Sequence, residues 1–239
     1  MSQSALPVSD DDVSPPGPLP DMLFARERMV DTQIRPVQVN DPRILKAMRE
    51  LPRERFVPPG RAAIAYMDQD VALGGGRVLT EPRVIARLIQ AMAPRRGERA
   101  LVVGAGTGYA ASLLEALGLV VVALEQNEAL GRHGKALLAE LAPAVRYETG
   151  PLAAGCPGQA PFDLILIDGA VRAVPEALAS QLVPGGRLGG ILALPGRVST
   201  AFVAEAGEVA GSAAIRPRPQ FDAATPLLPE LAPAPGFSF

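Results

Sequence analysis

The sequence predicts an α/β protein in which a central, mostly parallel β-sheet carries helices on both faces. The first reason is an alternation, from residue 99 onward, between short apolar runs and stretches of helical periodicity. The second is that the runs are apolar throughout, as in strands that are buried on both sides. The third is that glycine and proline separate the segments, as at Pro184-Gly185-Gly186. A chain of 239 residues is also long enough to enclose one large core.

The elements of this sheet follow one another in a regular order. The strands are expected at residues 100–103, 119–124, 145–148, 162–167 and about 187–194. The helices between them are expected at residues 109–117, 127–141 and about 173–182. Parallel strands that are joined by helices in this way are typical of Rossmann-like folds. We therefore assign residues 99–215 to a Rossmann-like core.

The region before the core, residues 22–98, is predicted to be mainly helical. Two helices are expected in its first half, the second with Asp41 as N-cap and Pro42 at its first position. Residues 61–80 look irregular, and a further helix is expected over 81–93. This region is expected to supply the substrate site and a lid that includes residues 66–68.

Both ends of the chain differ in composition from the rest. Residues 1–21 form an acidic and proline-rich segment with few large apolar side chains, which predicts a disordered tail. Residues 216–239 are rich in proline, which predicts an extended segment that wraps the surface. Phe237 and Phe239 are candidate anchors of this extension.

Composition excludes several classes of function. The net charge of −2, the absence of tryptophan and the lack of a basic run argue against a nucleic-acid partner. No apolar run is long enough to span a bilayer and no secretion signal is present, so we expect a cytoplasmic protein without a membrane partner. The lone Cys156 and the lone His133 leave no cluster for a metal. His133 lies in a polar segment, so chemistry that works without histidine is favoured.

A glycine-rich loop carries the functional inference. It directly follows the first strand of the core and consists of Gly104, Ala105, Gly106, Thr107 and Gly108. Glycines at such a turn allow a ligand to approach the backbone closely. A dinucleotide fingerprint has the spacing G-x-G-x-x-G, whereas here the third glycine comes one residue earlier. This shorter form suits a nucleoside without a pyrophosphate and is the pattern of S-adenosyl-L-methionine (SAM) enzymes.

The next strand ends at Glu125, whose carboxylate can accept hydrogen bonds from both hydroxyls of a ribose. The loop and Glu125 together predict a class I SAM-dependent methyltransferase fold. This hypothesis requires that the hollow beside the loop is open and that Glu125 faces it.

Several separated segments resemble protein-L-isoaspartate O-methyltransferases, and the resemblance covers about residues 26–196. The segments are Met29-Val30, Asp41-Pro42-Arg43-Ile44-Leu45-Lys46-Ala47-Met48, Pro52-Arg53-Glu54-Arg55-Phe56-Val57-Pro58, Ala65-Tyr66-Met67-Asp68, GGGRVLTEP over 74–82, VVGAGTGY over 102–109, and Ala160-Pro161-Phe162-Asp163 with the positions that follow it to Gly186. Their order and spacing together make the resemblance specific.

The resemblance implies protein repair by methyl transfer from SAM to the free carboxylate of an L-isoaspartyl residue. Such a carboxylate is already ionised at neutral pH, so the reaction needs no general base, in agreement with the scarcity of histidine. Catalysis then consists mainly of holding the nucleophile and the methyl group in line. The family's active-site serine corresponds to Thr80, which keeps the hydroxyl and is the candidate catalytic residue. Thr80 is alternatively only the cap of the helix that begins at residue 81.

The sequence departs from the family at four positions. Val102 and Pro151 stand where the family usually has acids that contact the cofactor, and Arg77 stands where it commonly has a glutamine. Asp168 follows the fourth strand, where the family has small or hydroxyl-bearing residues. It is a candidate cofactor-binding residue that replaces one lost acid, or alternatively only a loop acid at the end of a strand. Arg77 is either a residue that reshapes the pocket or a solvated loop residue.

These departures leave alternatives open. The chain is an active isoaspartyl methyltransferase, a catalytically impaired relative that binds SAM or protein, or a methyltransferase with another acceptor. An NAD-linked oxidoreductase ranks below these because of the glycine spacing. The oligomeric state does not follow from the sequence.

Overall fold

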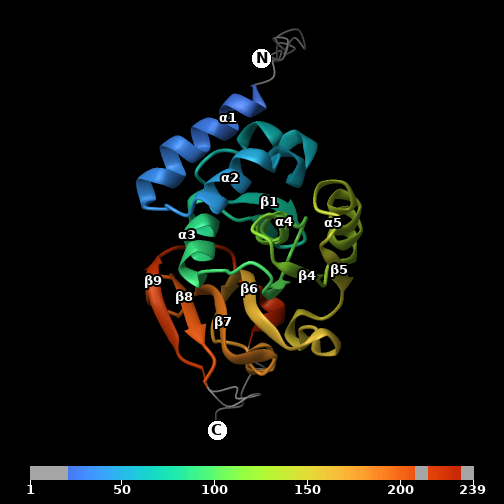
Figure 1. Cartoon of the computed structure of the whole chain (residues 1–239), viewed down its shortest axis with the longest axis vertical. Helices are drawn as coiled ribbons and strands as arrows, with labels where there is room; N and C mark the ends of the chain where they lie inside the picture. Colours follow the sequence, from blue (N-terminus) through green and yellow to red (C-terminus); the bar gives the residue numbers. More distant parts are fainter. Residues whose placement is uncertain (1–20, 208–214, 233–239) are drawn as a thin grey trace, which may run out of the picture.

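The computed structural model describes residues 21–207 and 215–232. Its main sheet has seven strands in the order β5-β4-β3-β6-β7-β8-β9 (Figure 1). The first five in this order are parallel, and β8 and β9 are antiparallel to their neighbours. The strands are β3 Arg99–Val103, β4 Val120–Glu125, β5 Arg146–Thr149, β6 Phe162–Val171, β7 Leu182–Leu192, β8 Thr200–Glu205 and β9 Pro217–Asp222. The prediction of a mostly parallel, Rossmann-like sheet is confirmed.

The two faces of the sheet are covered differently. One face carries the longer helices, which are α3 Pro82–Met92, α4 Tyr109–Ala116 and α5 Glu128–Leu141. The other face is covered by the short α6 Glu176–Ala179, by one-turn 3-10 helices and by the last described segment of the chain. The helix expected over about 173–182 is therefore much shorter than predicted, because Pro175 precedes its first turn and β7 already begins at Leu182.

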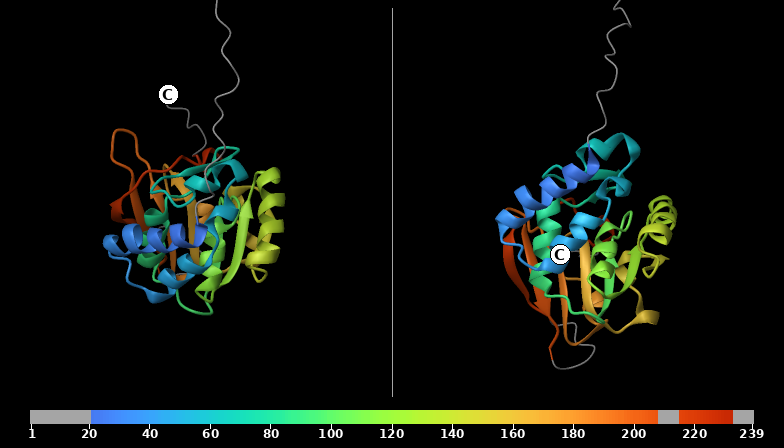
Figure 2. Two further views of the ribbon diagram at one scale, coloured as in Figure 1. Left: turned by 90° about the horizontal axis from the view of Figure 1, so that it is seen from above. Right: turned by 45° about the horizontal axis from the view of Figure 1, so that its top comes forward.

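The N-terminal region begins with α1 Met22–Met29, a π-helical turn Val30–Ile34 and α2 Pro42–Glu50. Asp41 caps α2 by accepting a hydrogen bond from the backbone N of Arg43, as the sequence predicts. Figures 1 and 2 show α1 and α2 gathered at one end of the molecule, next to α3. None of the helices in the described part of the chain has the length and apolar character that crossing a bilayer requires.

The expectation of irregular structure over 61–80 is wrong for its last ten residues. They form an antiparallel hairpin of β1 Val71–Gly74 and β2 Arg77–Leu79. The intervening Gly75 and Gly76 have φ of 57° and 76°, so the glycine run is the turn of the hairpin. The hairpin places Arg77 and Thr80 beside the carboxyl end of the main sheet, which the sequence did not indicate.

The proline-rich extension begins as an edge strand. Pro217 and Pro219 lie in β9, which pairs with β8 on one side only, and proline is tolerated there because an edge strand has unpaired N–H positions. After β9 the chain returns to the carboxyl end of β6, where Leu227 forms a parallel bridge with Ala170. Of the predicted tail over 1–21, residues 1–20 lie outside the described residues, as do the candidate anchors Phe237 and Phe239. Asp21 is the N-cap residue of α1.

Candidate functional site

The glycine-rich loop lies at the carboxyl end of β3, as predicted. Gly104, Gly106 and Gly108 have φ of 76°, 56° and 96°, a backbone conformation that other residues rarely adopt. Gly108 is the N-cap of α4. The hydroxyl of the buried Tyr147 donates a hydrogen bond to the carbonyl of Gly106 and so fixes the loop from the side of β5. Burial, and then the charge of Glu125, raise the pKa of Tyr147, so it remains a donor.

Glu125 is fully buried at the end of β4 and faces the loop. Its Oε2 accepts a hydrogen bond of 3.0 Å from the backbone N of Gly106. Its Oε1 accepts hydrogen bonds of 2.8 Å from the backbone N of Gln126 and of Asn127. Glu125 therefore faces the glycine-rich loop, as the sequence predicts.

Arg77 occupies the remaining acceptor positions of Glu125. Its Nε donates to Oε2 at 3.1 Å and its Nη2 to Oε1 at 2.9 Å, which is a bidentate ion pair. The side chain of Arg77 is only 2% exposed, so its interpretation as a solvated loop residue is wrong. Burial alone would lower the pKa of Arg77, but hydrogen bonds to Glu125 and Glu230 outweigh this and raise it. Glu125 thus accepts five hydrogen bonds and has no acceptor position left for a ribose.

The last described segment, residues 225–232, passes over the loop, and we call it the C-terminal strap. Its Glu230 pairs with Arg77 through bonds of 3.0 Å to Nη2 and 3.3 Å to Nη1. Its Leu228 is buried against Gly104 and Gly169. A Cβ atom at Gly169 would lie 2.6 Å from Cγ of Leu228, and one at Gly104 would lie 3.0 Å from Cδ1. A side chain at either glycine would therefore collide with Leu228, so the space between the two glycines is filled by this leucine.

Leu228 lies at the topological switch point of the sheet. The strand order reverses between β3 and β6, and ligands of such sheets bind in the crevice beyond the carboxyl ends of those two strands. Gly104 follows β3 and Gly169 lies in β6, so Leu228 contacts both sides of the crevice. With the ribose position taken by Arg77 and the crevice taken by Leu228, the observed arrangement does not fit a bound SAM molecule.

Thr80 and Asp168 form a second polar pair near this crevice. Oγ1 of Thr80 donates a hydrogen bond of 2.6 Å to Oδ1 of Asp168. Burial raises the pKa of Asp168 to about 6, which the bond from Thr80 partly counteracts and the charge of Asp70 reinforces. Thr80 is not a helix cap, because α3 begins at Pro82 with Glu81 as its N-cap residue. The hydroxyl is thus committed to Asp168.

A buried arginine holds the backbone at Thr80. Nη2 of Arg53 donates a 2.7 Å hydrogen bond to the carbonyl of Thr80, and Nε donates another of 2.7 Å to the carbonyl of Ala65. The guanidinium lies over the ring of Tyr109, 4.8 Å from its centroid. Arg53 of the P-R-E-R-F segment therefore holds the backbone at Thr80 from within the core, although 27 residues separate the two in the sequence.

The other candidate residues are placed as follows. Thr107 turns away from the crevice, because its Oγ1 donates to the carbonyl of Phe56 at 2.6 Å. Ala105 is buried, and its backbone N donates to the carbonyl of Leu124. Val102 is fully buried and Pro151 is exposed, and neither position supplies an acid to the site. Of the expected lid, the hydroxyl of Tyr66 is bonded to Arg26 and Glu54.

Sequence reasoning missed several residues of the site. Leu228, Glu230, Asp70 and Thr225 were not singled out, and only their meeting in space reveals them. The one available signal was the length of the proline-rich extension.

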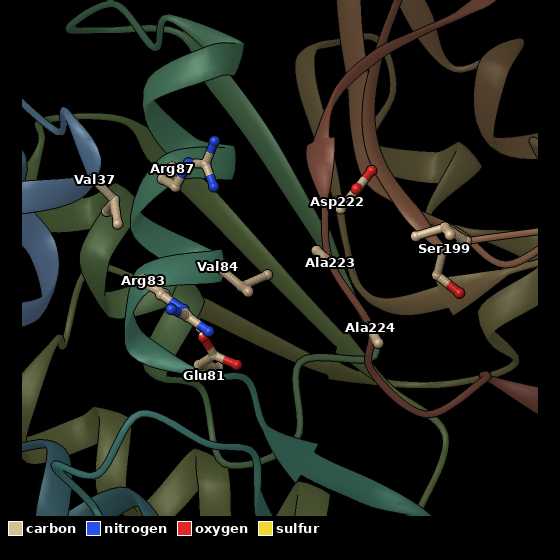
Figure 3. A pocket seen from close by; sticks show the side chains of 10 residues that line it. Val37, Glu81, Arg83, Val84, Arg87, Ser199, Asp222, Ala223 and Ala224 are labelled. Atoms are coloured by element: carbon tan, nitrogen blue, oxygen red, sulfur yellow. Dashed lines mark hydrogen bonds and ion pairs between the residues drawn. The ribbon is translucent and has the colours of Figure 1, made fainter.

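A cavity of about 490 Å³ lies away from this site, between α3 and β9, and is lined by Arg83, Arg87 and Asp222 among others (Figure 3).

Known proteins resemble the chain over most of its length. The family model described as protein-L-isoaspartate(D-aspartate) O-methyltransferase matches residues 25–195. The protein-L-isoaspartate O-methyltransferase of Methylorubrum extorquens (strain PA1) is 46% identical over 171 residues, which cover 72% of this chain and 75% of that protein. The enzyme of the same name from Methylorubrum populi is 46% identical over 164 residues, covering 69% and 77%.

Solved structures share the fold. A protein-L-isoaspartate O-methyltransferase superimposes with a TM-score of 0.73 at 24% identity, covering 87% of this chain and 67% of the other. A Plasmodium falciparum protein described as a putative member of the same family, in complex with S-adenosyl-L-homocysteine, gives a TM-score of 0.68 at 17% identity and covers 86% and 98%. At these identities the likeness concerns the fold alone.

Proposed function

Because the chain belongs to the protein-L-isoaspartate(D-aspartate) O-methyltransferase family, we propose that it methylates the free carboxylate of L-isoaspartyl residues in damaged proteins and peptides. Its methyl donor is S-adenosyl-L-methionine, and its activity is that of a transferase in protein repair. The alternative of a non-catalytic relative is not favoured by these matches. The observation that carries the proposal is the family match across both the helical region and the sheet. We also propose that the reaction takes place in the cytoplasm.

The Thr80–Asp168 pair supports a role on the acceptor side. An isoaspartyl carboxylate needs a hydrogen-bond donor to orient it, and Thr80 is the hydroxyl at the family's serine position. In the observed state the hydroxyl of Thr80 donates its hydrogen bond to Asp168 and is not available to the acceptor. When Asp168 is protonated, its own O–H donates to Thr80 Oγ1 and leaves the Thr80 hydroxyl free to donate to the acceptor. A pKa of about 6 brings this exchange within reach of neutral pH.

Methyl transfer to a synthetic peptide tests the function. Labelled SAM is incubated with the protein and a peptide that contains one isoaspartyl residue, and the same peptide with an ordinary aspartyl residue is the control. We expect label only in the isoaspartyl peptide. Label in both peptides, or transfer only to another acceptor, would reject the isoaspartyl substrate class.

Thr80→Val tests the residue. Removing the hydroxyl should lower kcat by about tenfold or more, since one oriented hydrogen bond to a charged group contributes roughly 1.5–3 kcal/mol. Thr80→Ser keeps the hydroxyl and is the matched control, which should retain most of the rate. Equal rates for the valine and serine variants would contradict the assignment.

A further inference from the structure

We propose that the C-terminal strap is a built-in occupant of the cofactor crevice, and that SAM binds only after the strap is released. This inference rests on the proposed function, because it concerns the cofactor of that same site. The strap is residues 225–232, and its contacts with the crevice are made by Leu228 and Glu230. The apparent affinity for the cofactor is then the affinity of the open form multiplied by the fraction of molecules in which the strap is open.

The first argument is the fit of Leu228 in the crevice. This side chain is 3% exposed and packs on Gly104 and Gly169, on the two sides of the switch point. The backbone of Gly169 does not have a positive φ, so its conformation does not require glycine. A side chain at this position would, however, collide with Leu228. The glycines on the two sides of the crevice therefore provide the space that Leu228 of the strap occupies.

The second argument is the chain of charges that ends on the strap. Glu125, which is expected to bind the ribose, pairs with Arg77, and Arg77 pairs with Glu230. The carboxylate of Glu230 thus helps to hold Arg77 in the position where it saturates Glu125. Without Glu230, Arg77 loses the partner that draws its Nη1 and Nη2 toward the strap.

The third argument is that the strap is attached in a defined register. Oγ1 of Thr225 donates a 2.7 Å hydrogen bond to Asp70. The backbone N of Ala170 donates to the carbonyl of Pro226 at 3.0 Å, and the backbone N of Leu228 donates to the carbonyl of Ala170 at 2.9 Å. These bonds pair the strap with β6 at Ala170. Glu230 is about one quarter exposed, at 24%, so this end of the strap is open to solvent. Such an arrangement can detach without unfolding the sheet.

Calorimetric titration with S-adenosyl-L-homocysteine tests the proposal without turnover. The proteins are the full chain, Leu228→Ala and Glu230→Gln, and Glu205→Gln is the control because it removes an exposed carboxylate from β8, away from the crevice. We expect both strap variants to bind at least about tenfold more tightly than the full chain and the control to bind like it. A full chain that binds only weakly while both strap variants bind gives the strongest support.

Equal affinities of the full chain and both strap variants would overturn the strap proposal and leave the methyltransferase function standing. Variants that bind S-adenosyl-L-homocysteine more tightly but transfer no methyl group to the isoaspartyl peptide would support the strap and reject the proposed function. No binding by any of the proteins at millimolar ligand would overturn both.

Hydrogen–deuterium exchange gives a second measurement that does not depend on a variant. The amides of Ala170 and Leu228 are donors in the bonds that hold the strap. Ligands usually slow exchange where they bind, but here S-adenosyl-L-homocysteine should speed exchange at these two amides while slowing it at Gly106. Slower exchange at all three amides would show that the strap stays closed around the ligand and would overturn the proposal.

Discussion

Two carboxylates at the same edge of the sheet have opposite surroundings. Glu125 is the last residue of β4 and Asp168 lies near the end of β6, and these two strands flank β3. Glu125 receives a bidentate arginine and three backbone N–H groups, so its charge is fully compensated. Asp168 receives one hydroxyl, and its pKa is raised to about 6. The comparison teaches that the two carboxylates differ in the number of donors around them, and that the raised pKa of Asp168 lets this group exchange a proton near neutral pH.

Removing the arginine from Glu125 should have the largest effect. Arg77→Met leaves a buried carboxylate with only backbone donors, and the loss of one partner of a buried pair costs about 3–5 kcal/mol of unfolding free energy. Chemical denaturation at pH 7 measures this loss. The matched control is Arg132→Met, which breaks an exposed pair with Glu128 and should cost less than about 0.5 kcal/mol. Similar losses in the two variants would show that the charge of Glu125 is not held by Arg77.

The pH dependence of stability should reveal Asp168 next. Its pKa is higher in the native protein than in the unfolded chain, so the native state binds more protons between about pH 4 and pH 6. The unfolding free energy contributed by this group therefore falls as pH rises through that window, by about 2 kcal/mol. Asp168→Asn removes the titration. We expect the stability of the wild type relative to this variant to decline from pH 4 to pH 7, and a constant difference would contradict the raised pKa.

The smallest effect concerns the single bond that Asp168 accepts. The hydrogen bond from Thr80 lowers the pKa of Asp168, so Thr80→Val should raise that pKa further, by roughly one unit for a bond of about 1 kcal/mol. Carbon-13 NMR titration of the Asp168 carboxyl group measures the shift. Thr80→Ser should leave the pKa close to that of the wild type. A downward shift in the valine variant would mean that Thr80 does not donate to Asp168.

Much of the fold and half of the candidate site could be predicted because their signals are local. The apolar runs of β3, β4 and β6 are recognisable as buried strands from the sequence. The glycines of the loop adopt the positive φ that their spacing suggests. The short hairpin around Gly75 and the strands β8 and β9 gave no comparable signal. β1 and β2 are only four and three residues long, β8 is a short run of six residues, and β9 contains Pro217 and Pro219. Each of them becomes a strand because a partner strand is available to it.

The sequence by itself determined the class of sheet, the position of the glycine loop and the orientation of Glu125, because each depends on neighbours along the chain. Only the tertiary structure decided what fills the crevice. Arg77 is 48 residues from Glu125 and 153 residues from Glu230, and Leu228 reaches Gly104 from the far end of the chain. Periodicity and spacing carry no information about such pairs, since these contacts form only when the core brings distant segments together.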